Sequence, residues 1–441
     1  MSDVLISRWD KLVAAQPDAL AVIDNRSQWT RSELDARAGE WAQKIPTDQL
    51  LQQAVILCQP NGADWLAKFL ALRRAGAIII PVDAATSIED SKKLAQKLSC
   101  FALQSSEHFE RFSQSRKWPT DLALVKLTSG TSGEPTAIPF TEAELCADGD
   151  NIQSTMGIGP SDLNYALLPF AHSYALGNLV IPLLASGIPL VVGSAPLPRI
   201  IADEITRSGA TVFPSVPTVF EALTRTDELS LGKLRLCITA AAPLTPTLAQ
   251  RFRNACGLSL HNFYGASECG GIAYDHTGQC GLTGNAVGAA MDNVELSATN
   301  DGRLCVRSAA VSSFEREAGK DGRAIITLHD KVSFLDNGGV VIHGRVDRIV
   351  KCAGKRIDLA ALEKVAIAVD GVERAAVVHE TASDRLLVAI IGPTESSTTL
   401  TALQANFGAW RGRLRVKSLP ELPVTLRGKV DYRELSRLLG G

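Results

Sequence analysis

Stretches whose apolar residues have the spacing of an α-helix alternate along this chain with short, continuous apolar runs that are typical of buried strands. Of all the features of the sequence, this alternation restricts the possible folds most strongly. In the first 120 residues the expected strands are 53–58 (QAVILC) and 77–83 (AIIIPVD), the second stopped by Pro81. The expected helices are 30–45, which begins with a capping box at Thr30 and Glu33, and 63–76, closed by Gly76. Such alternation predicts a parallel sheet flanked by helices.

The same pattern returns in a second α/β unit. Its expected strands lie in 165–170, 189–193, 210–217 and 234–244, and its expected helices lie near 174–186, 198–208, 218–225 and 245–256. Short strands at 302–308, 324–328 and 339–344 predict a small β subdomain. A compact tail follows, with helices at 358–369, near 399–410 and near 431–439 and strands at 374–380 and 385–392. We place the domain boundary at 345–347.

Composition limits the class of protein. A chain of 441 residues is too long for one hydrophobic core, and its net charge of −2 predicts no general attraction to nucleic acid or anionic membrane. The most apolar stretch, 179–193, is too short and too broken by Pro and Gly to span a bilayer. Nine scattered cysteines without a CxxC pair, and an N-terminus without a signal-peptide core, predict a cytoplasmic protein.

A loop rich in Gly, Ser and Thr, LTSGTSGEPTAI (127–138), follows the β-like run LALVKL. Glycines let backbone N–H groups converge on an anion, and hydroxyls add further donors. The loop is not a Walker loop, because no Gly-Lys-Ser/Thr follows Gly130 at the required spacing. Taken alone, it fits a surface turn as well as a phosphate cradle.

Three further motifs follow this loop in order, at 261–271 (HNFYGASECGG), 328–363 and 422–435 (LPVTLRGKVDYREL). Together with the loop they resemble the adenylate-forming acyl-activating superfamily, which includes acyl-CoA and aryl-CoA ligases, stand-alone adenylation domains and luciferase-like enzymes. The resemblance covers nearly the whole chain. It implies an α/β fold with a large N-terminal domain (1–345) of two helix-flanked mixed β-sheet subdomains and a small β-barrel-like subdomain. A small, mobile α+β C-terminal domain (346–441) would complete it.

The resemblance implies that the loop holds the β- and γ-phosphates of ATP with Thr128, Ser129, Gly130, Thr131, Ser132 and Gly133. The chain departs from the family at Thr136, where a lysine is usual. Loop amides, Mg²⁺ or Lys126 would then supply more of the stabilisation. Lys126 also fits a partly buried stem with a solvated head.

The nucleotide residues are carried over from the same motifs. Tyr264 would stack on adenine, Asn262 and Ala241 would lie at the nucleotide, Ser267 would contact the α-phosphate, and Glu268 would help to hold Mg²⁺. Asp330 would accept the ribose hydroxyls and Arg345 would lie near ribose and phosphate. His329 stands where the family has a glycine, and Glu268 alone also fits an ordinary loop carboxylate.

The expected acyl pocket is formed by His172, Ser173, Ala240, Ala242, Gly265 and Gly270. His172 fits either a gate at the pocket mouth or a core residue. Residues 163–186 contain no Asp or Glu to pair a substrate ammonium, which disfavours an α-amino acid. Only about 45 residues separate the strand at 77–83 from the loop, fewer than in most of the family, which favours a small aromatic or short acyl acid.

The small domain would carry Lys429 as the catalytic lysine, Asp347 as the hinge and Gly354 beside a thiol channel. A positioned ammonium stabilises charge where a carboxylate joins an α-phosphate. The implied reaction is a two-step ligation: acid and MgATP give an acyl-adenylate and pyrophosphate, and the acyl group then moves to coenzyme A or a carrier-protein phosphopantetheine. The alternatives are an amine acceptor, a reaction that stops at the adenylate, and a non-catalytic nucleotide- or acyl-binding homologue.

Overall fold

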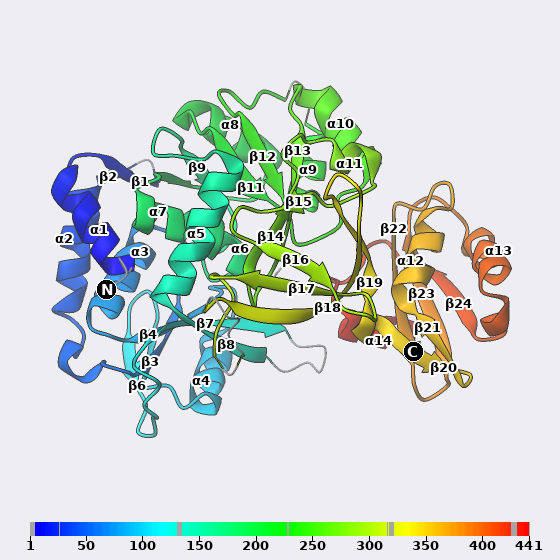
Figure 1. The fold of residues 1–441 in the computed structure, drawn as a ribbon, viewed down its shortest axis with the longest axis horizontal. Helices are drawn as coiled ribbons and strands as arrows, with labels where there is room; N and C mark the ends of the chain where they lie inside the picture. The colour runs from blue at the N-terminus through cyan, green and yellow to red at the C-terminus, as the bar shows by residue number, and fades with distance from the viewer. Residues whose placement is uncertain are drawn as a thin grey trace.

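The computed structural model describes residues 5–25, 27–129, 135–226, 229–314, 316, 322–424 and 430–440, and for Ser129, Pro135 and Asp347 it describes the backbone alone. Two large mixed sheets form the body of the protein, and a small group of strands and helices lies to one side of them (Figure 1). The N-terminal helices are α1 (Leu5–Ala15), α2 (Arg31–Ala42) and the 3₁₀ turn η1 (Thr47–Gln49). The predicted capping box at Thr30 and Glu33 is present at the start of α2.

The first sheet has six strands in the order β6-β5-β3-β4-β7-β8. They are β3 (Ala54–Cys58), β4 (Ile78–Val82), β5 (Ala102–Gln104), β6 (Phe109–Arg111), β7 (Leu122–Ser129) and β8 (Pro135–Thr141), with helices α3 (Ala63–Arg74) and α4 (Ile88–Lys97) between them. The prediction that Pro81 stops its strand is wrong, because β4 continues to Val82. The neighbour β7 pairs with β4 at Ile79 alone, so no ladder bond on that side is lost at Pro81.

The second sheet has nine strands in the order β15-β14-β13-β12-β11-β9-β10-β1-β2. They are β1 (Leu20–Asp24), β2 (Ser27–Thr30), β9 (Asn164–Ala166), β10 (Leu190–Val192), β11 (Val212–Ser215), β12 (Leu236–Thr239), β13 (Leu260–Ala266), β14 (Gly270–Tyr274) and β15 (Ala289–Ala290). The assignment of residues 1–120 to one unit is therefore wrong: β1 and β2 join this sheet, where Val22 lies opposite Leu190. The first sheet instead gains β7 and β8.

The four helices predicted for the second unit are present, and the structure adds α5 (Glu142–Met156) and the short α11 (Cys280–Thr283), which the sequence analysis missed. The predicted helices correspond to α6 (Ser173–Ala175) with α7 (Ile181–Ser186), α8 (Pro198–Ser208), α9 (Pro217–Leu223) and α10 (Pro246–Cys256). The helix expected near 174–186 is present but contains a π-helical segment, η2 (Leu176–Val180). Such π segments widen a helix locally and are frequent at functional sites.

The small β subdomain is an antiparallel sheet of β16 (Glu295–Ala298), β17 (Arg303–Ser308), β18 (Ala324–Phe334) and β19 (Val340–Arg345). Its strand order is β16-β17-β18-β19, and β16 does not pair with β19, so these four strands alone do not close into a barrel. The outer side of β19 is bonded to the stretch that leads into β15, because the N–H of Val287 donates to Val340 O at 2.8 Å and the N–H of Val340 donates to Gly288 O at 2.7 Å. The sheet follows the nine-stranded sheet along the chain and leads directly to the C-terminal elements (Figure 1).

The C-terminal elements begin with the 3₁₀ turn η3 (Val346–Arg348), at the predicted boundary. They continue with β20 (Ile349–Cys352), β21 (Lys355–Asp358), α12 (Leu359–Ile367), β22 (Arg374–Glu380), β23 (Arg385–Ile391), α13 (Ser396–Asn406), η4 (Gly408–Trp410), β24 (Leu414–Ser418) and α14 (Tyr432–Leu439). The sequence analysis missed β24, which pairs with β23 in parallel. Residues from this part alone form a buried cluster around Leu362, Val388 and Leu403. The division into two domains stays a prediction.

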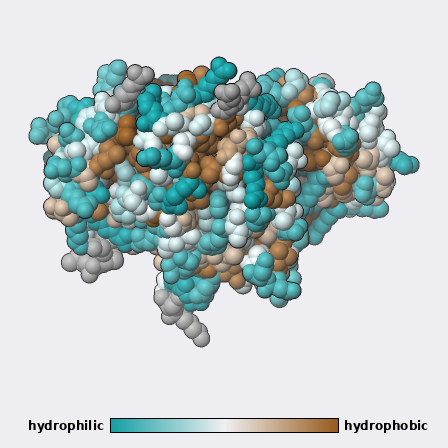
Figure 2. Space-filling model, turned by 90° about the horizontal axis from the view of Figure 1, so that it is seen from above, coloured by the Kyte–Doolittle hydropathy of each residue, from teal (hydrophilic) through white to brown (hydrophobic). Residues whose placement is uncertain are grey.

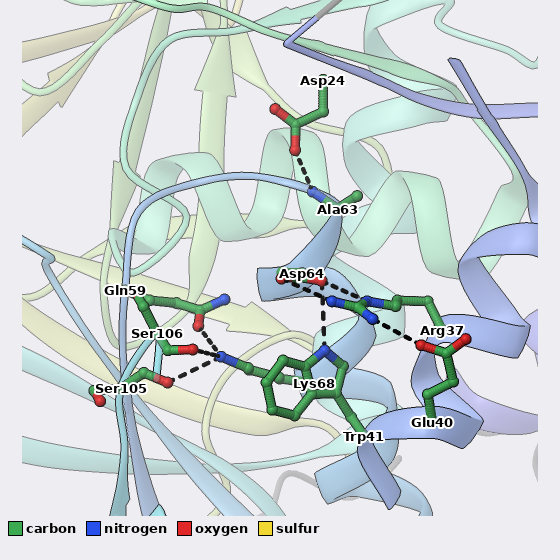
Figure 3. Close-up of polar contacts among 10 residues, drawn as sticks. All are labelled: Asp24, Arg37, Glu40, Trp41, Gln59, Ala63, Asp64, Lys68, Ser105 and Ser106. Atoms are coloured by element: carbon green, nitrogen blue, oxygen red, sulfur yellow. Dashed lines mark hydrogen bonds and ion pairs between the residues drawn. The ribbon is translucent and has the colours of Figure 1, made fainter. Parts of the chain in front are cut away.

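A polar cluster anchors α3 against the neighbouring loops (Figure 3). The ammonium of Lys68, which is 2% exposed, donates to Gln59 Oε1 at 2.6 Å, Ser105 O at 2.9 Å and Ser106 O at 2.8 Å. The same nitrogen lies 4.0 Å from the centre of the Trp41 ring. These four partners stabilise a buried charge that would otherwise be costly, so Lys68 has a structural role.

Hydrophilic and hydrophobic residues interleave on the face of the molecule seen from above (Figure 2). Among the described residues, no helix has both the length and the apolar character needed to cross a bilayer. All nine cysteines lie in the described parts of the chain and are free thiols.

Candidate active site

Three predicted nucleotide residues lie together where β13 meets the small β sheet. Asp330 and Arg345 are opposite each other in the β18–β19 register, and Arg345 Nη1 lies 3.2 Å from Asp330 Oδ2. Burial, followed by the negative charge of Asp330, raises the pKa of the Tyr264 hydroxyl, while Arg345 opposes the shift. The Asp330 side chain is 12% exposed and that of Arg345 is 47% exposed, so the carboxylate is largely buried and the guanidinium is half-exposed. The buried Tyr264 hydroxyl is close enough for the charge of Asp330 to act on it, but it has no hydrogen-bond partner among the described residues.

The turn between β13 and β14 carries Ser267 and Glu268, both half-buried. The Ser173 hydroxyl, from the start of α6, lies 3.1 Å from the Ser267 hydroxyl and so brings the predicted acyl pocket to the predicted α-phosphate contact. Buried Ser312 fixes this turn, because its N–H donates to Glu268 O at 3.0 Å and its hydroxyl donates to Pro139 O of β8 at 2.7 Å. The Glu268 turn is thus attached to β8, the strand that follows the predicted phosphate loop.

The alanines after β12 differ in their surroundings. Ala240 is buried, and its N–H donates to Ser215 O at 3.2 Å, whereas Ala241 and Ala242 are exposed. Ala241 has a φ of 70°, a left-handed conformation that costs a non-glycine residue about 1–2 kcal/mol. Such strain gathers at functional sites. This conformation is consistent with a specific task for the loop at Ala241.

Gly265 and Gly270 are required by close packing. A Cβ at Gly265 would lie 2.7 Å from Gly270 O, and one at Gly270 would collide with the carboxylate of Asp148. The same carboxylate accepts the N–H of Gly271 at 2.9 Å. Gly270 therefore packs against α5, a neighbour that the acyl-pocket prediction did not include.

The Lys126 ammonium lies inside the protein. Lys126 is 4% exposed and its nitrogen lies 4.1 Å from the centre of the Phe140 ring, so the prediction of a solvated head is wrong. Burial lowers the pKa of Lys126, and the negative charge of Asp148 is the first of several acidic groups that oppose the shift. Burial likewise raises the pKa of Asp148, and Lys126 opposes it. Thr136, where a lysine is usual, is exposed and lies opposite half-buried Thr128.

An acidic residue that the sequence analysis missed lies at the predicted mouth of the acyl pocket. His172 Nε2 is 3.0 Å from Asp83 Oδ2, and the two side chains are 16% and 14% exposed. Asp83 comes directly after β4, about ninety residues before His172 in the chain. The only sequence signal for it was its place at the end of a buried strand, where parallel sheets often carry polar site residues.

The sequence analysis also missed two buried hydroxyl groups next to the loop of Ala240–Ala242. Ser215 and Thr239 lie opposite each other at the ends of β11 and β12, both fully buried. In the part of the chain that the structure describes, neither hydroxyl oxygen has a hydrogen-bond partner. Nearby, the Tyr174 hydroxyl donates to Ile238 O at 3.1 Å. Buried polar atoms of this kind call for an explanation, and a bound polar group is one.

The remaining predicted site residues do not belong to the cluster of Tyr264, Asp330 and Arg345, or they lie outside the described residues. Asn262 is buried in β13 opposite Thr239. Gly354 is exposed in the β20–β21 turn, where a Cβ would meet no atom of the described residues within 4 Å, and its place beside a thiol channel stays a prediction. Outside the described residues lie Gly130, Thr131, Ser132, Gly133 and Lys429, together with the side chains of Ser129 and Asp347.

Comparison with known proteins gives a consistent result. The sequence matches the family described as AMP-binding enzyme over residues 9–103 and 89–313. Oxalate–CoA ligase from Arabidopsis thaliana is 23% identical and covers 98% of each chain. Tyrocidine synthase 3 from Brevibacillus parabrevis is 23% identical over 97% of this chain, but the chain spans only 8% of that protein's length.

A solved structure has the same fold. That of Klebsiella oxytoca NpsA, in complex with 3-hydroxyanthranilyl-AMSN, superposes with a TM-score of 0.84 over 99% of both chains, at 18% identity. The predicted α/β class with mixed sheets is confirmed.

Proposed function

The chain belongs to the family of AMP-binding enzymes, and on this premise we propose that it is an acid–thiol ligase. It activates a carboxylic acid other than an α-amino acid as the acyl-adenylate and then transfers the acyl group to a thiol, which forms a thioester and releases AMP. In the first step the acid's carboxylate oxygen bonds to the α-phosphorus of ATP, and the bond from that phosphorus to pyrophosphate breaks.

The observation that carries this proposal is the cluster of Tyr264, Asp330 and Arg345. A buried carboxylate that faces a guanidinium and a phenol offers acceptors for two ribose hydroxyls and a positive charge for phosphate. Tyr264 would pack on the adenine ring. Ser267 would contact the α-phosphate, and its hydroxyl contact with Ser173 supports a reaction beside the proposed acyl pocket.

The residues of the site fit a hard divalent cation. Glu268 supplies a half-buried carboxylate in a turn that Ser312 fixes, and the neighbouring hydroxyl of Ser267 adds oxygen rather than nitrogen or sulfur. Mg²⁺ bound with ATP would neutralise phosphate charge there. This contribution is needed because Thr136 offers no ammonium and the Lys126 ammonium lies inside the protein.

Lys429 would stabilise the negative charge that develops as the carboxylate attacks, as the resemblance implies. A turn of the small domain about Asp347 would then withdraw Lys429 and bring the Gly354 hairpin to the site for thiol transfer. Gly354 is exposed, and a Cβ added to it would meet no atom of the described residues within 4 Å. This exposure is consistent with a hairpin that does not contact the adenylation site in this structure.

Coenzyme A is the acceptor we favour, and a carrier-protein phosphopantetheine is the alternative. The Arabidopsis relative that covers 98% of each chain has an acid and coenzyme A in its name. For the acid, the absence of acidic residues from 163–186 argues against an amino-acid substrate. Asp83 does not change this argument, because its carboxylate faces the imidazole of His172.

Pyrophosphate exchange with a broad panel of acids tests the proposal. We expect exchange that depends on an added small aryl or short acyl acid and on Mg²⁺, and not on amino acids. The products formed with coenzyme A, a holo-carrier protein or an amine, identified by mass, then decide the acceptor. ATP binding without exchange for any acid would instead indicate a nucleotide-binding homologue and refute the enzyme.

A further inference from the structure

A second group of reactive side chains lies in the C-terminal part of the chain, apart from the site described above. Cys352 ends β20, His379 lies near the end of β22, and Asp384 lies in the turn that leads to β23. One ligand atom from each, the thiol sulfur, an imidazole nitrogen and a carboxylate oxygen, lie within 4.8 Å of one another. Within this group, His379 Nε2 is 2.9 Å from Asp384 Oδ1.

The backbone holds these three side chains in place. Asp384 has a φ of 50°, and its Oδ2 accepts the N–H of Ala353 at 2.9 Å. The carbonyl of Cys352 accepts the indole N–H of Trp410 at 3.0 Å. The hairpin β20–β21 is therefore attached to the β22–β23 turn on one side and to η4 on the other, and the three ligand atoms belong to segments that are already fixed.

We propose that Cys352, His379 and Asp384 form a binding site for a divalent cation of the zinc class, with water as the fourth ligand. Sulfur, imidazole nitrogen and one carboxylate oxygen are the ligands that Zn²⁺ takes in tetrahedral sites, whereas Mg²⁺ prefers oxygen alone. Binding forms a metal–sulfur bond and releases the thiol proton to solvent.

The geometry is close to that of such a site. Bond lengths of 2.0–2.3 Å in a tetrahedron separate ligand atoms by about 3.5 Å, so ligand movements of about an ångström close the cluster on a cation. Cys352 is fully buried, whereas the side chains of His379 and Asp384 are 13% and 36% exposed. A cation would thus enter from the carboxylate side and meet the sulfur innermost.

Some charged groups around the three residues favour cation binding and others oppose it. Burial, followed by Asp384, raises the pKa of the Cys352 thiol, and the guanidinium of Arg413 opposes this shift. His379, followed by the N–H of Ala353, lowers the pKa of Asp384, so this ligand is an anion. Arg413 Nη1 lies 3.5 Å from Asp384 O and would repel a dication, but its charge also favours the thiolate that the metal requires.

A cation at this site would tie the hairpin that carries Gly354 to the β22–β23 turn. The site does not depend on the proposed ligase activity, because none of its three residues belongs to the adenylation site. A metal-binding measurement therefore succeeds or fails independently of pyrophosphate exchange.

Co²⁺ titration of the full, untagged chain, in buffer with excess Mg²⁺, tests the inference. We expect one Co²⁺ per chain that survives gel filtration, with a thiolate-to-cobalt absorption band in the near ultraviolet and displacement by Zn²⁺. Cys352→Ser and His379→Gln should abolish the band, and Asp384→Asn should weaken binding at least about tenfold. Cys305→Ser, at a half-buried thiol beside Thr327 of the small sheet, is the matched control and should leave the band unchanged.

Three results would overturn the site: no bound Co²⁺ at micromolar metal, bound Co²⁺ without the thiolate band, or a band that survives Cys352→Ser. Each would mean that the three residues form only a hydrogen-bonded turn. If Cys352→Ser does not fold, the variants of His379 and Asp384, which are less buried than Cys352, decide the question, because their circular dichroism spectra can be matched to that of the parent chain.

Discussion

Substitution of Asp148 by Asn isolates the charge of the buried carboxylate behind the candidate active site. Asn keeps the shape of the side chain and an oxygen for the N–H of Gly271, but it removes the negative charge that partly offsets that of Lys126. Both residues are 4% exposed, so water cannot replace the lost interaction. Breaking a buried ion pair typically costs about 3–5 kcal/mol, and this is an upper limit here, because Lys126 and Asp148 form no direct ion pair in the described structure and other acidic groups also act on Lys126.

The expected change in melting temperature depends on the number of residues that unfold together. Unfolding entropy of about 2.1 cal/mol/K per residue gives about 0.7 kcal/mol/K for roughly 345 residues, so this upper limit corresponds to a fall in Tm of about 4–7 °C for Asp148→Asn. Calorimetry and urea unfolding measure it. The double variant Lys126→Met with Asp148→Asn should recover part of the loss, since neither buried charge remains.

Asp150→Asn is the matched control, because Asp150 lies on the same helix in a half-exposed ion pair with Arg8 at 2.7 Å. It should cost no more than about 1 kcal/mol. The reasoning is refuted if Asp148→Asn is as mild as Asp150→Asn, or if the two buried substitutions are additive. In the stable double variant the KM for ATP should be unchanged; a large rise would instead assign Lys126 to the phosphates.

Three further predictions concern the site and the fold. Lys429→Ala should lower the rate of adenylate formation by about 10²–10³ with unchanged melting, as measured by pyrophosphate exchange, and a full rate would refute its catalytic role. Asp330→Asn should raise the KM for ATP about tenfold or more, whereas an equal KM would remove Asp330 from the ribose site. Lys68→Met should lower stability by about 2–4 kcal/mol near neutral pH, because it leaves Ser105 O and Ser106 O without their donor. Burial lowers the pKa of Lys68 to about 8 in the folded protein, whereas its ordinary value is 10.5. Between these two pH values the lysine is protonated in the unfolded chain but not in the folded one. The free energy of unfolding of the parent chain should therefore rise as the pH rises above about 8, by at most about 1.4 kcal/mol per pH unit. Urea unfolding should show this rise in the parent chain and not in Lys68→Met.

Much of the secondary structure could be predicted because it depends on residues close together in the chain. The helix at α2 follows from its capping box, which is present, and the helix expected at 245–256 is present as α10. The parallel strand β24 was missed because it is only five residues long, LRVKS, and although its apolar and charged residues alternate, only two of them are apolar.

The site was predictable only in part. Motif order indicated Tyr264, Asp330 and Arg345, and the fold brings these residues together. Asp83 and Asp148 could not be found in this way, because each belongs to the site through a contact with a residue about 90 to 120 positions away. No local pattern encodes such a contact.

What the sequence determined by itself is therefore the α/β class, the order of the motifs and the residue types that nucleotide chemistry needs. Tertiary structure alone decided that β1 and β2 join the second sheet, that the Lys126 ammonium faces the interior, and that Cys352 meets His379 and Asp384. The physical reason is the same in each case. Periodicity and capping act over a few residues, whereas strand partners, buried charges and ligand clusters depend on which distant segments pack together.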